Sequence, residues 1–235
     1  MTEVAIDETL EAARQRLARA LDAAGRHPRA AELLAVSKTK PATLIRAAYA
    51  SGQRAFGENY LQEALDKQQA LADLDDIVWH FIGPLQSNKT RQVAEHFAWV
   101  HSVDRDKIAR RLSEQRPEQL PPLNICLQVN ISDEPTKAGV RLADLPALAE
   151  AVMALPRLQL RGLMAIPAPC DDPQHQRVPF ARLREALEEL KTRHPEAPLD
   201  TLSMGMSDDL EAAVAEGATQ VRLGTAIFGQ RPPRD

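Results

Sequence analysis

From residue 33 onward, short apolar runs alternate with longer segments whose apolar residues recur at helical spacing. The short runs predict strands over Leu33–Ser37, Arg54–Gly57, Val78–Gly83, Trp99–Ser102, Leu123–Ile131, Leu158–Ile166, Thr201–Met204 and Gln220–Leu223. The segments between them predict helices over Ala42–Ser51, Asn59–Ala72, Ser87–His96, Arg105–Arg116, Leu142–Leu155, Pro179–His194 and Ser207–Glu216. Strands that alternate with helices indicate parallel βαβ units. About eight such units in roughly 200–250 residues are typical of a (β/α)8 TIM barrel.

One further helix is predicted before the first strand. Leu10, Leu17 and Leu21 lie on one stripe at helical spacing, and Gly25 is a plausible stop. We expect this extra N-terminal helix to pack outside the barrel or across its lower end. The competing fold is an open doubly wound sheet, because strand order cannot be read from one sequence. The glycine-rich dinucleotide fingerprint expected after the first strand of such a sheet is missing, so the pattern favours one barrel domain over residues 1–235.

Composition and charge narrow the class of protein. The 235 residues carry 29 Lys and Arg against 33 Asp and Glu, a net charge of −4, with only 4% aromatic residues. This balance argues against a nucleic-acid-binding or anionic-membrane surface. Cys126 and Cys170 are too few for a disulfide framework and lack metal-ligand spacing. Acidic residues stand where a signal peptide would be basic, and no apolar run approaches a membrane span. We expect a cytoplasmic protein.

A lysine at the end of the first predicted strand is a candidate for chemistry. Lys38 shares its alternation with Leu34 and Val36, and Pro41 suits the first position of the following helix. Lys38 is therefore expected at the carboxyl-terminal mouth of the barrel, where barrel enzymes place their active sites. An amine among apolar side chains has a lowered pKa and is a better nucleophile. The alternatives are a lysine that extends to solvent or a structural ion pair.

The ends of the last two predicted strands have the residues of a phosphate site. Ser203 and Thr225 offer hydroxyl groups, while Gly205 and Gly224 let backbone N–H groups approach an anion. Barrels often bind phosphate at this position, beside a short helix N-terminus. The alternative is a pair of ordinary turns, and Ser207 before two acids is better interpreted as a helix cap.

Arg222 lies in the middle of the last predicted strand, where its neighbours indicate burial. A buried guanidinium needs a partner. That partner could be a carboxylate from an adjacent strand, such as Glu58 or Asp104, or an acceptor atom of a ligand.

Several segments resemble, in order along nearly the whole chain, the pyridoxal phosphate homeostasis proteins. They are Ala35–Pro41, Phe56–Tyr60, Trp79–Lys89, Val100–Asp104, Gln128–Ile131, Lys137–Gly139, Arg161–Met164, Leu202–Glu216 and Val221–Gly229. The resemblance implies a barrel similar to the alanine racemase N-terminal domain, with pyridoxal 5′-phosphate (PLP) as cofactor. It implies that Lys38 holds PLP as a Schiff base, that Arg222 faces the pyridine nitrogen, and that the other cofactor-binding residues are Asn59, Ser203, Gly224 and Thr225.

Four further residues have two interpretations each. Met164 and Met204 could line the cofactor ring or belong to the core. His80 and His101 lie within the shared segments, but a hydrogen-bonded core histidine is the safer interpretation, and no metal site is indicated.

The residues favour binding over catalysis. A permanent cation at Arg222 disfavours protonation of the pyridine ring and so weakens PLP as an electron sink. Racemisation needs a second acid–base group, a tyrosine in the alanine racemases, and only Tyr60 lies near the mouth. We therefore expect a PLP carrier in vitamin B6 homeostasis, with apo PLP-dependent enzymes as possible recipients. The alternatives are a PLP-dependent amino-acid racemase and a structural barrel without cofactor.

Overall fold

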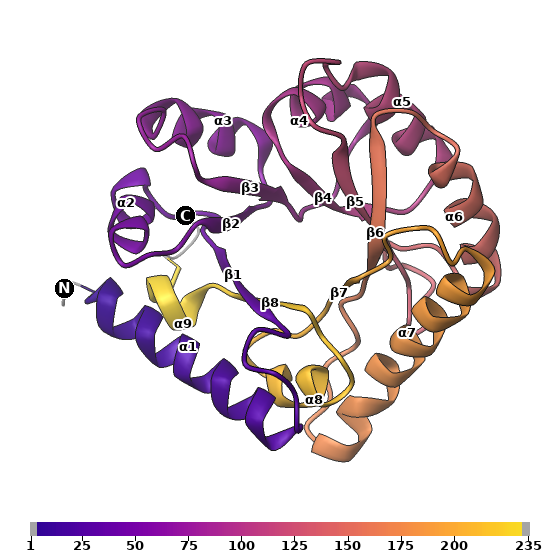
Figure 1. Cartoon of the computed structure of the whole chain (residues 1–235). Helices are drawn as coiled ribbons and strands as arrows, with labels where there is room; N and C mark the ends of the chain where they lie inside the picture. The colour runs from indigo at the N-terminus through magenta and orange to yellow at the C-terminus, as the bar shows by residue number, and fades with distance from the viewer. Residues whose placement is uncertain (1–3, 232–235) are drawn as a thin grey trace.

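The computed structural model describes residues 4–231 and contains a closed barrel of parallel strands. The strands are β1 Glu32–Val36, β2 Ala55–Glu58, β3 Val78–Phe81, β4 Trp99–Val103, β5 Leu123–Gln128, β6 Leu158–Met164, β7 Thr201–Ser203 and β8 Gln220–Leu223. Each pairs with the next, and β1 pairs with β8 in the register Glu32↔Gln220 and Leu34↔Arg222. This closing pair excludes the open sheet and confirms the predicted (β/α)8 barrel. Figure 1 shows the strands as a central ring inside the helices.

The helices follow the strands in the predicted alternation. They are α1 Ile6–Ala23, α2 Ala42–Ala50, α3 Leu61–Ala70, η1 Ser87–Lys89, α4 Thr90–His96, α5 Asp106–Gln115, η2 Leu142–Asp144, α6 Leu145–Met153, α7 Pro173–Arg193, α8 Leu210–Ala215 and α9 Thr225–Phe228.

The clearest departures from the predicted helix starts are at α7 and α8. Helix α2 begins at Ala42 as predicted, with Pro41 as its extended N-cap rather than its first helical residue. Helix α7 begins at Pro173 rather than Pro179, because the Asp172 side chain accepts a hydrogen bond from Gln174 N and caps an earlier first turn. Pro179 is accommodated inside α7, whose buried face continues at Phe180 and Leu183. Pro179 therefore lies within the helix and does not mark its start.

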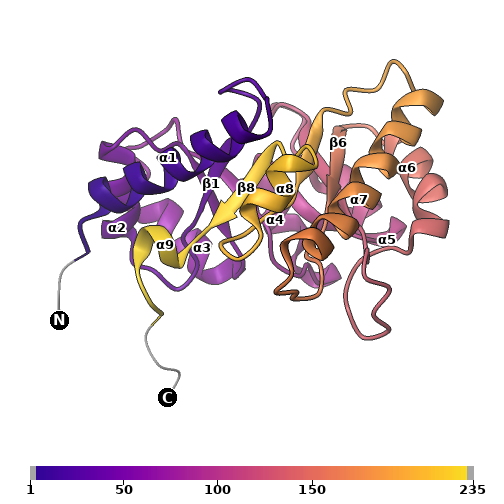
Figure 2. The ribbon, with the colours of Figure 1, turned by 90° about the horizontal axis from the view of Figure 1, so that it is seen from below.

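Helix α1 lies on the outside of the barrel, as predicted. It packs against α8, α9 and α2, and Thr9 Oγ1 donates to Ile227 O at 2.7 Å. Figures 1 and 2 show α1 running along the barrel wall beside α8 and β8. Its buried stripe includes the predicted Leu10, Leu17 and Leu21. Within residues 4–231, no helix combines the length and apolar character that a membrane crossing needs.

The barrel interior is unusually polar. The large apolar core lies between strands and helices, whereas the apolar cluster of Trp99, Cys126 and Met164 is small and separate. His101 and Arg222 are among the buried polar residues that accompany it. Barrel interiors are more commonly filled by Val, Ile and Leu, so this polar filling points to function at the two barrel ends.

Candidate functional site

A cavity of about 410 Å³ lies at the carboxyl ends of the strands. Its lining includes five of the six residues predicted to bind the cofactor, namely Lys38, Asn59, Arg222, Gly224 and Thr225. The sixth, Ser203, is fully buried on β7 and does not line this cavity. The structure therefore brings together residues from β1, β2 and β8 that lie far apart in the sequence.

The backbone on both sides of Lys38 is fixed by hydrogen bonds. Lys67 Nζ donates to Ser37 O at 2.7 Å, and Thr39 N donates to Glu63 Oε1 at 2.6 Å. Thr39 has a φ of 66°, a left-handed conformation that costs energy for a β-branched residue. The two hydrogen bonds hold this turn, and so they set where the Lys38 side chain begins.

These hydrogen bonds come from a buried ion network outside the barrel wall. Lys67 is 6% exposed and contacts Glu58 and Glu63, each at 2.7 Å, while Ser37 Oγ donates to Glu58 Oε1. Burial raises the pKa of Glu58, whereas Lys67 and the hydrogen bond from Ser37 lower it. Glu58 Oε1 is thus held by Lys67 and Ser37, while Oε2 is buried without a partner in the described residues.

Asn59 follows β2 and faces the cavity beside Lys38. Its Oδ1 is buried and has no hydrogen-bond partner in the described part of the chain. The close approach of β3 makes Gly83 necessary, because a Cβ there would lie 2.4 Å from Asn59 O. An orphaned amide oxygen in this position fits the donor or hydroxyl groups of a polar ligand such as PLP.

The opposite side of the cavity is formed by Gly224, Thr225 and Ser207. Helix α9 is one turn long, and the first N–H groups of a helix have no partner within it. The predicted cap at Ser207 is wrong: α8 begins at Leu210 with Asp209 as N-cap, and Asp209 Oδ1 accepts from Met206 N. The Ser207 side chain instead lines the cavity. Sequence reasoning missed it because the predicted helix began three residues too early.

Arg222 has neither of the carboxylate partners considered from the sequence. Its Nη1 donates to Ser203 Oγ at 2.6 Å and its Nη2 to Ala165 O at 3.1 Å. Glu58 is held by Lys67, and Asp104 Oδ2 accepts from Gly139 N. Burial lowers the pKa of Arg222 to about 10, so the guanidinium remains a cation at neutral pH.

A buried hydrogen-bonded chain continues from Arg222 into the barrel. Ser203 Oγ lies 2.8 Å from His101 Nδ1, and His101 Nε2 lies 2.9 Å from His80 Nδ1. A guanidinium only donates, so Ser203 Oγ accepts from Arg222 and shares a further hydrogen bond with His101 Nδ1. His101 Nε2 and His80 Nδ1 share the next hydrogen bond. Burial lowers the pKa of His80 to about 3 and, with the nearby Arg222 charge, that of His101 well below its ordinary range. Both rings are therefore neutral at pH 7.

The remaining sequence candidates lie away from the cavity. Met164 and Met204 are fully buried in apolar clusters, which supports the core interpretation for both. Tyr60 is 42% exposed and is absent from the cavity lining. Burial raises the pKa of Cys126 to about 12. No group of potential metal ligands occurs among residues 4–231.

The fold and the site define a barrel of the alanine racemase class. The family described as "Alanine racemase, N-terminal domain" matches residues 9–232. Curated relatives share most of the chain. The pyridoxal phosphate homeostasis protein of Pseudomonas aeruginosa is 64% identical over 226 residues, 96% of either chain. The corresponding protein of Escherichia coli is 55% identical over 228 residues, covering 96% of this chain and 97% of that one. The chain belongs to the pyridoxal phosphate homeostasis protein family.

A solved structure gives the same fold with a ligand. PipY of Synechococcus elongatus, determined with PLP bound, is 45% identical and superposes with a TM-score of 0.80 over 91% of this chain and 100% of that one. The family resemblance inferred from the sequence is thereby confirmed.

Proposed function

We propose that this protein binds PLP reversibly as a Schiff base on Lys38 and takes part in PLP homeostasis in the cytoplasm. The observation that carries the proposal is the convergence of Lys38, Asn59, Arg222, Gly224 and Thr225 on one cavity. PLP bound to the similar PipY supports it. When bound, PLP supplies an aldehyde that a lysine amine captures with loss of water.

Each part of the cavity has a distinct task in this proposal. The Thr39 turn, held by Glu63 and Lys67, positions Lys38. Ser207, Gly224 and Thr225 hold the phosphate, and Ser207 replaces Ser203 in this role because Ser203 Oγ is engaged by Arg222. In this proposal Ser203 does not bind the phosphate; its hydrogen bond with Arg222 orients the guanidinium instead.

Arg222 favours a holding function over catalysis. A cation that cannot lose its proton at neutral pH opposes protonation of a nearby pyridine nitrogen. Tyr60, the tyrosine considered as a second acid–base group for a racemase, lies at the surface as the N-cap of α3. Loaded protein could then deliver PLP to apo PLP-dependent enzymes.

Borohydride reduction followed by peptide mass spectrometry tests the Schiff base. PLP should be fixed at Lys38, and Lys38→Ala should abolish both the fixed adduct and the yellow colour. Lys40→Ala is the matched control, because Lys40 is only two residues from Lys38 but its Nζ donates to Gln230 O. An adduct retained in Lys38→Ala would contradict the proposal. Faster reconstitution of an apo enzyme by loaded protein than by free PLP would support delivery, and racemisation of L-alanine at enzymatic rates would refute a holding function.

A further inference from the structure

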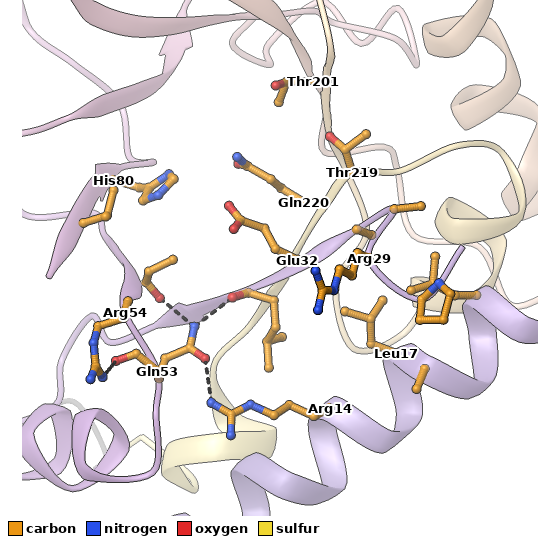
Figure 3. Close-up of a pocket in the computed structure, with 18 of the residues that line it drawn as sticks. Arg14, Leu17, Arg29, Glu32, Gln53, Arg54, His80, Thr201, Thr219 and Gln220 are labelled. Atoms are coloured by element: carbon orange, nitrogen blue, oxygen red, sulfur yellow. Dashed lines mark hydrogen bonds between the residues drawn. The ribbon is translucent and has the colours of Figure 1, made fainter. Parts of the chain in front are cut away.

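A second, larger cavity opens at the other end of the barrel. It has a volume of about 790 Å³ and lies between the amino ends of the strands, helix α1 and the loop that joins α1 to β1. Figure 3 shows the side chains of Glu32, His80 and Gln220 reaching into the same space from three strands. None of these residues takes part in the site around Lys38.

The floor of this cavity has hydrogen-bond acceptors without donors. Glu32 and Gln220 are register neighbours on β1 and β8, so their inward side chains lie side by side. Gln220 is 4% exposed and its Oε1 has no partner within residues 4–231. An unpaired buried oxygen is unfavourable, and a hydrogen-bond donor on a ligand would satisfy it.

The neighbouring cation is already occupied. Arg161 donates to both carboxylate oxygens of Asp200 and to Asn124 Oδ1, and its guanidinium lies over the Trp99 ring. The Glu32 side chain is exposed to solvent and makes no hydrogen bond or ion pair in the described structure, although partial burial raises its pKa. Arg161 forms its ion pair with Asp200 and acts on Glu32 only through its charge, so the Glu32 carboxylate remains available to a ligand donor.

The rim has the opposite character. Arg14 from α1 and Arg29 from the following loop line the cavity on that side, and Arg29 is exposed. Leu17, Leu21 and Leu33 add apolar surface to the lining. A ligand that fits carries an ammonium group for the acceptors of the floor, a carboxylate for an arginine of the rim and an apolar side chain for the leucines.

We propose that this cavity is a second ligand site, which binds a free α-amino acid with an apolar side chain. The ammonium group contacts Glu32 and Gln220, the carboxylate faces Arg29, and the side chain lies against the leucines. The site is independent of the Schiff base on Lys38. It is nevertheless connected to the cofactor site, since His80 on its wall begins the hydrogen-bonded chain to Arg222.

Calorimetric titration with L-norleucine tests the site. The wild-type protein is first reduced with borohydride so that bound PLP no longer reacts with amines, and the PLP-free Lys38→Ala protein is titrated in parallel. We expect saturable binding by both, which separates this result from the fate of the Schiff-base proposal. N-acetyl-norleucine, which lacks the ammonium, and norleucinamide, which lacks the carboxylate, should each bind at least about tenfold more weakly, a loss of about 1.4 kcal/mol.

Two variants with matched controls locate the ligand. Glu32→Gln should weaken norleucine binding at least tenfold and Arg29→Gln several-fold. The controls Glu196→Gln and Arg19→Gln, both at exposed positions away from the cavity lining, should leave it unchanged. The ¹⁵N resonances of the His80 ring should shift on binding.

Three outcomes overturn the proposal. They are no saturable binding up to 20 mM ligand, equal binding of N-acetyl-norleucine, and unchanged affinity in Glu32→Gln.

Discussion

The two ends of the barrel both hold polar cavities, but they are built from different parts of the chain. At the carboxyl end, Lys38, Asn59 and Thr225 follow strand ends and belong to loops and first helical turns. At the amino end, Glu32, His80 and Gln220 are inward residues of the strands themselves. A site made from loops leaves contiguous motifs in the sequence, whereas a site made from single residues of successive strands leaves none.

The two ends of the barrel also differ in whether their charged side chains have ion-pair partners. The turn beneath Lys38 rests on the closed ion network of Glu58, Lys67 and Glu63. At the amino end Glu32 has no ion-pair partner in the described structure, although Arg161 is close enough to affect its pKa. Removing charges at the two ends should therefore have opposite effects on stability.

The largest effect is expected at the carboxyl end, from Lys67→Met. This change leaves Glu58 buried without its cation, and breaking a buried ion pair from one side costs about 3–5 kcal/mol. Urea unfolding at pH 7, with an unchanged dependence on denaturant, measures the loss. Lys107→Met, at an exposed position of α5, is the control and should stay within about 0.5 kcal/mol of wild type.

A double variant separates charge from packing. Glu58→Gln combined with Lys67→Met removes both charges and should recover part of the loss, because no buried ion is then left unpaired. A Lys67→Met loss below about 1 kcal/mol would show that the network does not hold the carboxyl end as described.

A smaller effect is expected for His101→Leu, which interrupts the chain between the two ends. The change removes one hydrogen-bond partner from Ser203 Oγ and one from His80 Nδ1, and each unpaired buried group costs about 1–3 kcal/mol. The leucine recovers some apolar contact, so we expect a net loss of about 2 kcal/mol in urea unfolding. His96→Leu, on an exposed position of α4, should change stability little. Equal stability of His101→Leu and wild type would show that the hydrogen bonds through His101 do not stabilise the fold.

The buried histidines of this hydrogen-bonded chain also predict how the stability of the protein depends on pH. The pKa of His80 falls from 6.5 to about 3 on folding. Between these values the unfolded chain binds a proton at His80 that the folded protein does not, so stability decreases as pH falls below 6.5. The slope from one such group is about 1.4 kcal/mol per pH unit. The free energy of unfolding in urea, measured from pH 7 to pH 4, should fall less steeply with pH in His80→Phe than in the control His175→Phe. His175 lies at an exposed position.

The sequence predicted the strands and the position of Lys38 because both depend on local alternation. Leu34, Val36 and Lys38 share one face of β1, and that face determines where the lysine points. Ser203 and Ser207 were harder to assign, since the choice between them depends on where α8 begins. Because α8 begins at Leu210 and not at Ser207, Ser207 lines the cavity and does not cap the helix.

The partners of Arg222 could not be predicted from one sequence. They are Ser203 and Ala165 O, brought into reach by the packing of β6, β7 and β8. For the same reason, neither the chain through His101 and His80 nor the amino-end cavity was anticipated. Contacts across a closed barrel depend on register, and register is a property of the assembled sheet.

The smallest expected effect is at the amino end, and its sign is opposite. Burial raises the pKa of Glu32, so the folded protein disfavours the carboxylate relative to the unfolded chain. At pH 7 the charge therefore costs stability, and Glu32→Gln should stabilise the protein by about 0.3–0.5 kcal/mol, a small value because cavity solvent screens the charge. The gain should shrink as pH falls through the raised pKa of Glu32, where the wild-type side chain also becomes neutral. Thermal and urea unfolding at pH 7 and pH 4 measure both, with Glu196→Gln as control. A destabilisation of about 1 kcal/mol would mean that Glu32 has a structural partner and that the two ends are alike. Stabilisation together with lost norleucine binding would mean that the carboxylate serves the ligand rather than the fold.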